Sequence, residues 1–327
     1  MKTSVGGVGS SAGGITHGSL DFEGGRIPMA LATGRTAGPT LVVIGMQHAT
    51  EFSGPGAVDR VLNDLPVERL TGTLMCLPIV NPLQFRQTPE EFREAWKDPS
   101  RNLNRQWPGD RSSANPLSRL AAFVWEEALS GAAAVLDLHC CRSVDPRFAA
   151  CLDGHEASLS LATSLGLDAV DAQTPASYHG GQLVIAAAQR CDIPAVLIES
   201  HPSAFQVREA VDACSGAIFR AMVHLGMLPR WSAPRRQQAV PIFRRAEPSH
   251  ALKTAKAGYL GVRRWSGDAA RKGEAVAVVR SCETFEVLEE FVSPVDGAVG
   301  CVGHPEGQAL VEAETVVATV KAVRFAS

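Results

Sequence analysis

The sequence has few aromatic residues, no long apolar run and no paired-cysteine motif. Aromatic residues make up 6% of the 327 positions, hydrophobic residues 45% and charged residues 20%, a balance typical of a globular protein rather than a disordered one. The longest apolar runs, such as residues 40–44, are far shorter than the roughly 20 residues that a membrane helix needs. The sequence therefore predicts no membrane-spanning segment and gives no reason to expect a membrane partner.

Two further absences concern the compartment and the partners. The first residues, MKTSVGG, lack the apolar stretch of a secretory signal, and the eight cysteines include no CxxC pair, which favours reduced core thiols. These features predict a cytoplasmic location. The net charge is −3 and basic residues do not gather with aromatic ones, which argues against a nucleic-acid partner. Subunit number is left open, so a homo-oligomer is compatible with the sequence.

Residues 40–227 alternate between short β-branched runs and longer amphipathic stretches. We expect strands at residues 40–45, 74–80, 133–139 and 195–199, and helices around 57–65, 120–129 and 207–225. This alternation predicts an α/β fold with a doubly wound, mostly parallel or mixed sheet. In such a sheet, ligands bind beyond the carboxyl ends of the strands.

The pattern changes towards the C-terminus to short strands separated by Gly and Asp turns, such as residues 267–268 and 296–297. This change predicts a smaller all-β domain. We therefore expect two domains, an α/β domain over residues 1–235 and an all-β domain over residues 236–327. The stretch Pro229 to Pro248 is expected to be a solvated linker.

Three residues with metal-binding side chains lie where expected strands end. His48 and Glu51 are three positions apart in GMQHATE, a spacing that lets both side chains converge on one cation. His139 ends the strand VLDLH, with Asp137 on the same strand face, where its carboxylate can orient the histidine. Each residue alone is explained by ordinary structure. Together, two histidines and one carboxylate form a typical catalytic zinc set with a fourth position open.

Glu199 and a polar loop add groups that a catalytic metal would need. Glu199 ends the apolar run AVLIE, where a carboxylate is costly unless it is catalytic or paired, for instance with Arg208. The loop RNLNRQWPG at residues 101–109 offers an arginine fork that suits a carboxylate, although a Pro-Gly-rich surface loop is the plain alternative.

Taken in order, these segments resemble the succinylglutamate desuccinylase and aspartoacylase family, a branch of the zinc carboxypeptidase superfamily. The resemblance spans about residues 40–205 and is carried by GMQHATE, IVNP, NLNRQWPG, LDLH and LIES. It implies a zinc carboxypeptidase-like fold and one Zn²⁺ per chain, held by His48, Glu51 and His139.

The resemblance also implies roles for other residues. Glu199 would be the general base that activates water and then protonates the leaving amine, while Asn104 and Arg105 would bind a substrate carboxylate. Arg86 is our candidate for polarising the scissile carbonyl, with Arg93 and Arg101 as alternatives.

Three departures from the family pattern predict a modified substrate pocket. Ala49 replaces the usual glycine, and Asn102 replaces the usual acid before Leu-Asn-Arg. The segment 86–101 is longer than in many relatives, and Ser200-His201-Pro202 follows Glu199 where relatives commonly have a glycine.

The C-terminal region resembles the family's second domain, a lipoyl-type barrel-sandwich, through SPVDGAV and RKGE. A lysine at a hairpin tip, which would carry biotin or lipoate, is not evident, so we expect this domain to be structural or to shape the cleft. Tyr259 is predicted to approach the substrate from there, with a core or surface role as the alternative.

The main hypothesis is a zinc-dependent amidohydrolase that removes a small acyl group from an N-acyl amino acid or related amine. A zinc carboxypeptidase acting on short peptides is the second hypothesis. The third is a metal-binding scaffold that has lost catalysis, against which Glu199 and the Asn104-Arg105 pair argue, since a scaffold requires neither.

Overall fold

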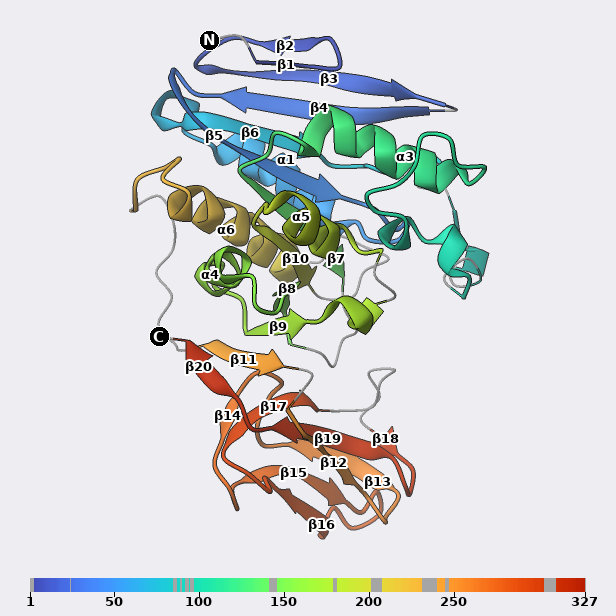
Figure 1. The fold of residues 1–327 in the computed structure, drawn as a ribbon. Coiled ribbons are helices and arrows are strands. Elements are labelled where there is room, and N and C mark those ends of the chain that lie inside the picture. Colours follow the sequence, from blue (N-terminus) through green and yellow to red (C-terminus); the bar gives the residue numbers. More distant parts are fainter. Residues whose placement is uncertain are drawn as a thin grey trace. The chain divides into compact units, whose positions relative to one another are not determined.

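The computed structural model divides the chain into two compact units. It describes residues 3–23, 25–84, 87–88, 90–91, 94, 97–140, 146–178, 181–200, 208–230, 240–244, 247–302 and 310–326. The first unit comprises Met1–Cys140, Ala150–Gly166 and Thr174–Arg236, and the second comprises Cys141–Ala149, Leu167–Gln173 and Gln237–Ser327. Figure 1 follows the chain through both.

A mixed sheet runs through the first unit. In sheet order its strands are β8 (Phe148–Leu152), β10 (Ala195–Ser200), β7 (Ala134–Cys140), β5 (Thr36–Gly45), β6 (Thr71–Leu77), β4 (Gly25–Thr33) and β3 (Gly14–Phe22). The pairs β10–β7, β7–β5 and β5–β6 are parallel, whereas β4 is antiparallel to both of its neighbours, β6 and β3. A separate two-stranded sheet pairs β1 (Thr3–Val5) with β2 (Val8–Ser10). The predicted mixed, mostly parallel sheet is confirmed.

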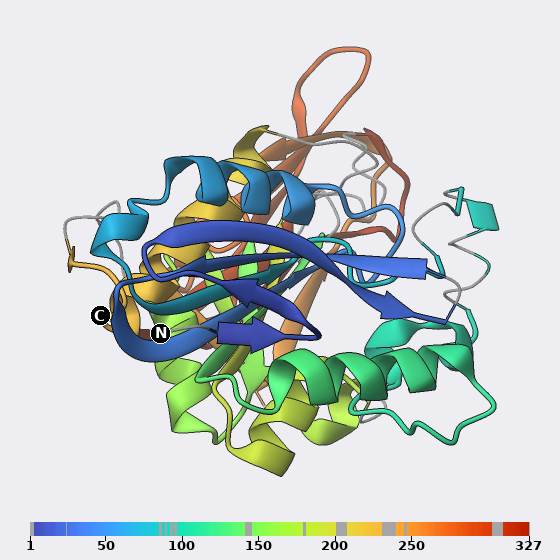
Figure 2. The same ribbon diagram turned by 90° about the horizontal axis from the view of Figure 1, so that it is seen from above.

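Helices cover both faces of this sheet. They are α1 (Ser53–Asp64), α3 (Pro116–Val124), α4 (Glu156–Ser164), α5 (Leu183–Cys191) and α6 (Arg208–His224). Short 3₁₀ helices are η1 (Val67–Arg69), η2 (Pro99–Arg101), η3 (Leu103–Arg105) and η5 (Pro175–Tyr178), and η4 (Trp125–Leu129) is a π-helix. Seen from above, α1 and α3 lie on opposite sides of the strands (Figure 2). α1 packs against β5, β7 and α6. No helix in the described part of the chain has both the length and the apolar character to cross a bilayer.

The central strands are apolar because both of their faces are covered. β6 and β7 are buried along nearly their whole length, as is the second half of β5. Because β5 and β7 are parallel neighbours, their carboxyl ends meet at the same edge of the sheet. The polar side chains that follow the two strands therefore come together there.

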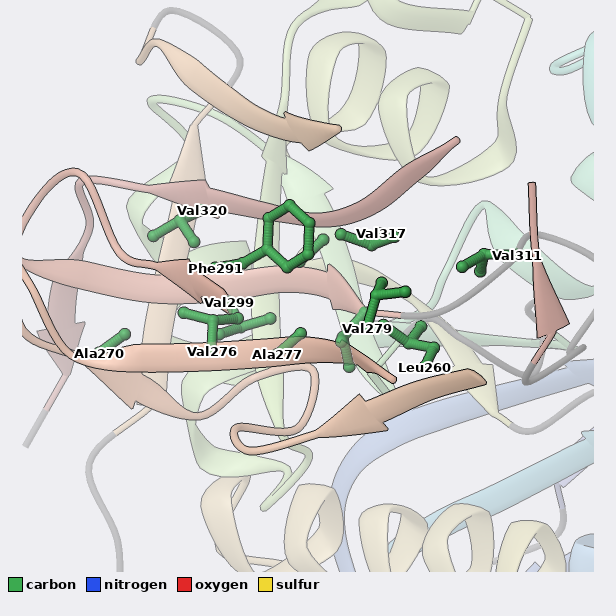
Figure 3. Packing of buried hydrophobic residues seen from close by; sticks show 12 residues of the cluster. Leu260, Ala270, Val276, Ala277, Val279, Phe291, Val299, Val311, Val317 and Val320 are labelled. Carbon is green, nitrogen blue, oxygen red and sulfur yellow. The ribbon is translucent and has the colours of Figure 1, made fainter. Parts of the chain in front are cut away.

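The second unit is largely antiparallel β-structure. One set of strands has the order β20 (Arg324–Ala326), β11 (Val240–Arg244) and β9 (Ala169–Gln173). A four-stranded sheet has the order β12 (Ser249–Lys253), β19 (Val316–Lys321), β17 (Gly297–Val302) and β14 (Ala269–Ala270). A second four-stranded sheet has the order β16 (Val287–Val292), β15 (Ala275–Arg280), β13 (Gly258–Val262) and β18 (Leu310–Val311). Both four-stranded sheets contribute to one core around Val276, Val299 and Val317 (Figure 3). The predicted all-β character of this region is confirmed.

Candidate metal centre

The centre forms where β5 and β7 end. β5 stops at Gly45, and Met46 adopts a left-handed conformation with φ 50°, which turns the chain at the sheet edge. His48 lies in the turn that follows, and Glu51 lies two residues before α1. His139 occupies the next-to-last position of β7. Two short segments that are 88 or more residues apart in sequence therefore meet here through parallel strand pairing.

His48, Glu51 and His139 point their donor atoms at one another. The Nδ1 atoms of the two histidines are 3.2 Å apart. Glu51 Oε1 lies 2.8 Å from His48 Nδ1, and Glu51 Oε2 lies 3.0 Å from His139 Nδ1. All three residues are buried, with exposed fractions of 2%, 8% and 3%. One ligand atom from each lies within 4.8 Å of the others, so the three form a group consistent with a metal site.

The donor set fits a divalent cation. A tetrahedral ion with bonds of about 2.0–2.1 Å separates its ligand atoms by about 3.3 Å. The separations of 2.8–3.2 Å between the three donor atoms are close to that value. Two bare imidazole nitrogens that face each other repel, and a shared cation removes that repulsion.

Charge inside the cluster shifts the titration of two of its members. Burial alone would raise the pKa of Glu51, but the charges of His48 and His139 outweigh it and lower the pKa to about 2. Burial alone would lower the pKa of His139, but the carboxylates of Asp137 and Glu51 hold this pKa well above its usual value. The buried carboxylate therefore stays ionised and can serve as a metal ligand.

The outer nitrogen of each histidine also has a partner. His139 Nε2 lies 3.0 Å from Asp137 Oδ2, and Asp137 is fully buried. His48 Nε2 lies 3.1 Å from Asn102 Oδ1. Hydrogen bonds to these oxygens place the proton on Nε2 and direct both Nδ1 atoms inward. The structure thus places Asp137 beside His139 and Asn102 beside His48.

Sequence reasoning missed two more members of the cluster. Gln47 donates from Nε2 to Asp137 Oδ2 at 2.6 Å, and Trp107 donates from Nε1 to Gln47 Oε1 at 2.8 Å. The only sequence signals were the position of Gln47 beside His48 and of Trp107 within NLNRQWPG. Neither position predicts the contact between them, because they are 60 residues apart.

Glu199 lies on the strand next to His139. In the parallel pair of β10 and β7, Glu199 is in register with His139, so both side chains point to the same face of the sheet. Neighbouring strands are about 4.8 Å apart, which places the two residues side by side. Glu199 is half-buried. Arg208, its suggested salt-bridge partner, lies instead beside Asp212 at 3.9 Å.

Asn104 and Arg105 lie two and three residues after Asn102, the partner of His48. Asn104 is buried, and its Oδ1 accepts the backbone N–H of Leu183 at 3.0 Å, at the start of α5. Arg105 is half-buried and donates from Nη1 to the Asn104 carbonyl at 2.6 Å. Asn104 thus also has a structural contact, and its side-chain NH₂ is the group suited to donate to a substrate.

The remaining predicted residues are Arg86, with Arg93 and Arg101 as its alternatives, and Tyr259. Arg86 and Arg93 lie outside the described residues, so the choice among the three arginines rests on the sequence. Arg101 is exposed, and its backbone carbonyl accepts Gln84 Nε2 at 2.9 Å. Tyr259 belongs to the second unit, where it is 38% exposed and its ring centre lies 5.7 Å from that of Phe285.

Comparison with known proteins assigns the family. Residues 37–199, which carry every residue of the cluster, match the succinylglutamate desuccinylase/aspartoacylase catalytic domain. The chain belongs to the succinylglutamate desuccinylase/aspartoacylase family. The resemblance inferred from the sequence is confirmed. A comparison with curated protein sequences gave no match.

Solved structures show that the family fold extends over nearly the whole chain. A succinylglutamate desuccinylase from Silicibacter sp. TM1040 is 18% identical, with a TM-score of 0.64 and coverage of 95% of each chain. A succinylglutamate desuccinylase/aspartoacylase from Rhodobacter sphaeroides is 20% identical, with a TM-score of 0.64 over 95% of this chain and 96% of that one. The product-bound ectoine utilization protein EutE (DoeB) from Ruegeria pomeroyi is 18% identical, with a TM-score of 0.63 over 94% and 95%.

Proposed function

We propose that this family member is a zinc-dependent amidohydrolase that removes a small acyl group from an N-acyl amino acid or a related amine. The proposal draws on the family, whose names describe removal of acyl groups from amino acids. The main support for this proposal is the position of Glu199 beside His139. It puts a carboxylate next to the three residues that could hold a metal ion.

The ligand set favours zinc among common divalent ions. Two imidazole nitrogens and one carboxylate are the ligands of many catalytic zinc sites, whereas magnesium and calcium prefer oxygen ligands alone. A zinc ion bound here supplies Lewis acidity, which lowers the pKa of water and polarises a carbonyl group. His48, Glu51 and His139 would hold it.

Glu199 would move the proton. Its carboxylate, on the same sheet face as His139, accepts a proton from the attacking water and returns it to the nitrogen of the leaving amine. A single carboxylate suffices for both steps, because the amine needs the proton that the water has lost. Arg86 would polarise the scissile carbonyl, with Arg93 and Arg101 as the alternatives for this role.

Asn104 and Arg105 would hold the far end of the substrate. A guanidinium fork and an amide N–H match the two oxygens of a carboxylate, which an N-acyl amino acid carries and a simple amide lacks. Arg105 is already oriented by its bond to the Asn104 carbonyl. We also expect Tyr259 to contact the substrate. Residues 236–327 remain our prediction for the second domain.

The test is an assay of the zinc-loaded protein on acetyl, succinyl and formyl amino acids beside dipeptides. We expect release of the acyl group, loss of activity with a chelator, and recovery with Zn²⁺. Glu199→Gln should lower kcat by about 10²–10⁴-fold, since that is the usual contribution of a general base. Glu68→Gln, at an exposed carboxylate outside the centre, is the matched control.

Each competing hypothesis has its own outcome in this assay. Zinc-dependent cleavage confined to dipeptides would favour the carboxypeptidase. A protein that binds zinc tightly and hydrolyses no substrate in the panel would favour the inactive scaffold. Full activity in Glu199→Gln would show that Glu199 is not the base.

A further inference from the structure

The side chain of Gln47 joins the loop of Trp107 to the partner of a metal ligand. Gln47 is fully buried, and Trp107 is 4% exposed. Gln47 Oε1 accepts the indole N–H of Trp107 at 2.8 Å, and Gln47 Nε2 donates to Asp137 Oδ2 at 2.6 Å. The same Asp137 oxygen lies 3.0 Å from His139 Nε2. An unbroken chain of hydrogen bonds therefore runs from Trp107 to His139.

The chemistry of its two neighbours fixes the amide of Gln47 in one orientation. An indole N–H can only donate, and an ionised carboxylate can only accept. If the amide were flipped, its NH₂ would face the indole donor and its oxygen would face the carboxylate. Both contacts would then be repulsive and buried, where an unsatisfied polar group costs about 1–3 kcal/mol. Trp107 thus determines which end of Gln47 reaches Asp137.

The orientation of Gln47 in turn constrains His139. Asp137 Oδ2 lies between Gln47 Nε2 and His139 Nε2 and accepts a hydrogen bond from each. His139 therefore donates from Nε2 to Asp137, and its Nδ1 faces Glu51 and His48. We propose that Gln47 is a positioning residue, held by Trp107, that fixes Asp137 and thereby aims His139 at the metal.

The backbone at this point is held independently of the Gln47 side chain. Asn81 donates from Nδ2 to the Gln47 carbonyl at 2.9 Å, and Val80 N–H bonds to the Gly45 carbonyl at 3.0 Å. Replacing the Gln47 amide with an apolar group therefore leaves these anchors of the turn in place. A variant at Gln47 consequently tests the side-chain relay rather than the fold of the loop.

The proposal rests on the proposed metal function of this centre, and its test measures metal binding rather than turnover. The variants are Gln47→Met, which keeps the side-chain length, and Trp107→Phe, which removes the indole N–H and keeps a ring. Zn²⁺ affinity is measured by competition with a chromophoric chelator, and ligand geometry by the absorption spectrum of the Co²⁺-loaded protein. Gln173→Met and Trp125→Phe are controls, at another buried glutamine and at a half-buried tryptophan in η4.

We expect Gln47→Met to weaken Zn²⁺ binding by about 10–100-fold, the usual effect of removing an outer partner of a metal ligand. Trp107→Phe should weaken it less, by about 3–10-fold by the same reasoning, since Gln47 remains. Both should alter the Co²⁺ spectrum. The double variant should bind as Gln47→Met does, because Trp107 acts only through Gln47.

Wild-type affinity and an unchanged Co²⁺ spectrum in Gln47→Met would overturn the proposal. Additive losses in the double variant would show that Trp107 acts through packing and would overturn the relay. If Gln47→Met fails to fold, as judged by thermal unfolding of the metal-free protein, Trp107→Phe decides by the same readouts. A protein that binds metal as expected and lacks deacylase activity would refute only the proposed function, whereas one that binds no metal would refute both.

Discussion

His48 Nε2 lies 3.1 Å from Asn102 Oδ1, whereas the corresponding nitrogen of His139 faces a carboxylate, Asp137. The two histidines therefore have different outer partners: His48 faces a neutral amide, and His139 faces an anion. Asn102 Oδ1 also accepts the backbone N–H of Asn104 at 2.9 Å, which fixes the amide's orientation. Glu51 and Asp137 would together balance the charge of a divalent ion at this centre, and Glu199 adds a further carboxylate beside His139.

Substitution of Asn102 tests this arrangement. Asn102→Ala removes the acceptor of His48 and should weaken Zn²⁺ binding by about 10–100-fold. Asn102→Asp keeps an acceptor and adds a negative charge, so Zn²⁺ should bind more tightly while its Lewis acidity, and with it kcat, falls. Chelator competition and steady-state kinetics measure these effects. Equal affinity in all three proteins would show that Asn102 does not support His48.

Asn115 provides the control for Asn102. Its Oδ1 accepts the backbone N–H of Leu117 at 3.0 Å as the N-cap of α3, a bond of the same kind outside the centre. Asn115→Ala should therefore cost about 1 kcal/mol of stability, as for other helix caps, and leave metal affinity unchanged.

Zinc should stabilise the protein against unfolding, because His48, Glu51 and His139 form a single site only in the folded chain. An ion at about 100 times its dissociation constant contributes about 2.7 kcal/mol. We expect the thermal midpoint of the chelator-treated protein to rise by several degrees when Zn²⁺ is added. In His139→Ala this rise should disappear. A rise of the same size in His139→Ala would place the stabilising zinc elsewhere.

A purely structural prediction concerns Ser158 in α4. Its buried Oγ accepts the backbone N–H of Ala195 at 2.9 Å and lies 2.7 Å from His155 Nδ1. Ser158→Ala leaves that buried N–H without its acceptor, which should cost about 1–3 kcal/mol in the free energy of unfolding. Urea denaturation measures the loss. Ser160→Ala, at an exposed position of the same helix, should change stability by less than about 0.5 kcal/mol.

Five of the described cysteines, three of them buried and two exposed, should fall into two classes of reactivity. Burial raises the pKa of the Cys76 thiol to about 12, and Cys151 and Cys214 are also buried, whereas Cys191 and Cys282 are exposed. A thiol reagent should therefore label Cys191 and Cys282 quickly in the native protein and the three buried thiols only on unfolding. The Cys191→Ser/Cys282→Ser variant should lose two equivalents of the fast reaction. Fast native labelling of Cys76 would contradict this assignment.

The strands that carry the site were predictable because their sequences are locally distinctive. The run expected at residues 195–199 corresponds to β10, and the run expected at 133–139 corresponds to β7, each displaced by one residue at most. A strand buried on both faces is a continuous apolar run, which is recognisable without knowledge of its neighbours.

The order of the strands in the sheet could not be predicted from the sequence in the same way. The hairpin of β3 and β4 was missed because β3 is only partly buried and has a mixed sequence. Within the predicted linker, Val240–Arg244 forms β11, held by pairing with distant strands.

The same distinction applies to the site. His48, Glu51 and His139 could be proposed from local spacing and strand ends, because parallel pairing brings such ends to one edge. Gln47 and Trp107 could not, because their contact depends on how a loop 60 residues away folds back onto β5. Local patterns thus predict ligands, and tertiary packing decides which residues support them.

The last prediction separates recognition of the substrate from chemistry at the metal. Arg105 is half-buried, and its Nη1 is bonded to the Asn104 carbonyl, so its guanidinium is oriented before substrate binds. Lysine keeps the charge but cannot make two parallel hydrogen bonds to a carboxylate. Arg105→Lys should therefore raise KM for N-acyl amino acids by about 10-fold or more, the equivalent of one charge-assisted hydrogen bond, with a smaller change in kcat. For an N-acyl amine without a carboxylate, KM should stay the same. Arg111→Lys, at an exposed arginine paired with Glu126, is the control and should change neither constant. Equal increases in KM for both substrates would show that Arg105 shapes the pocket without binding the carboxylate.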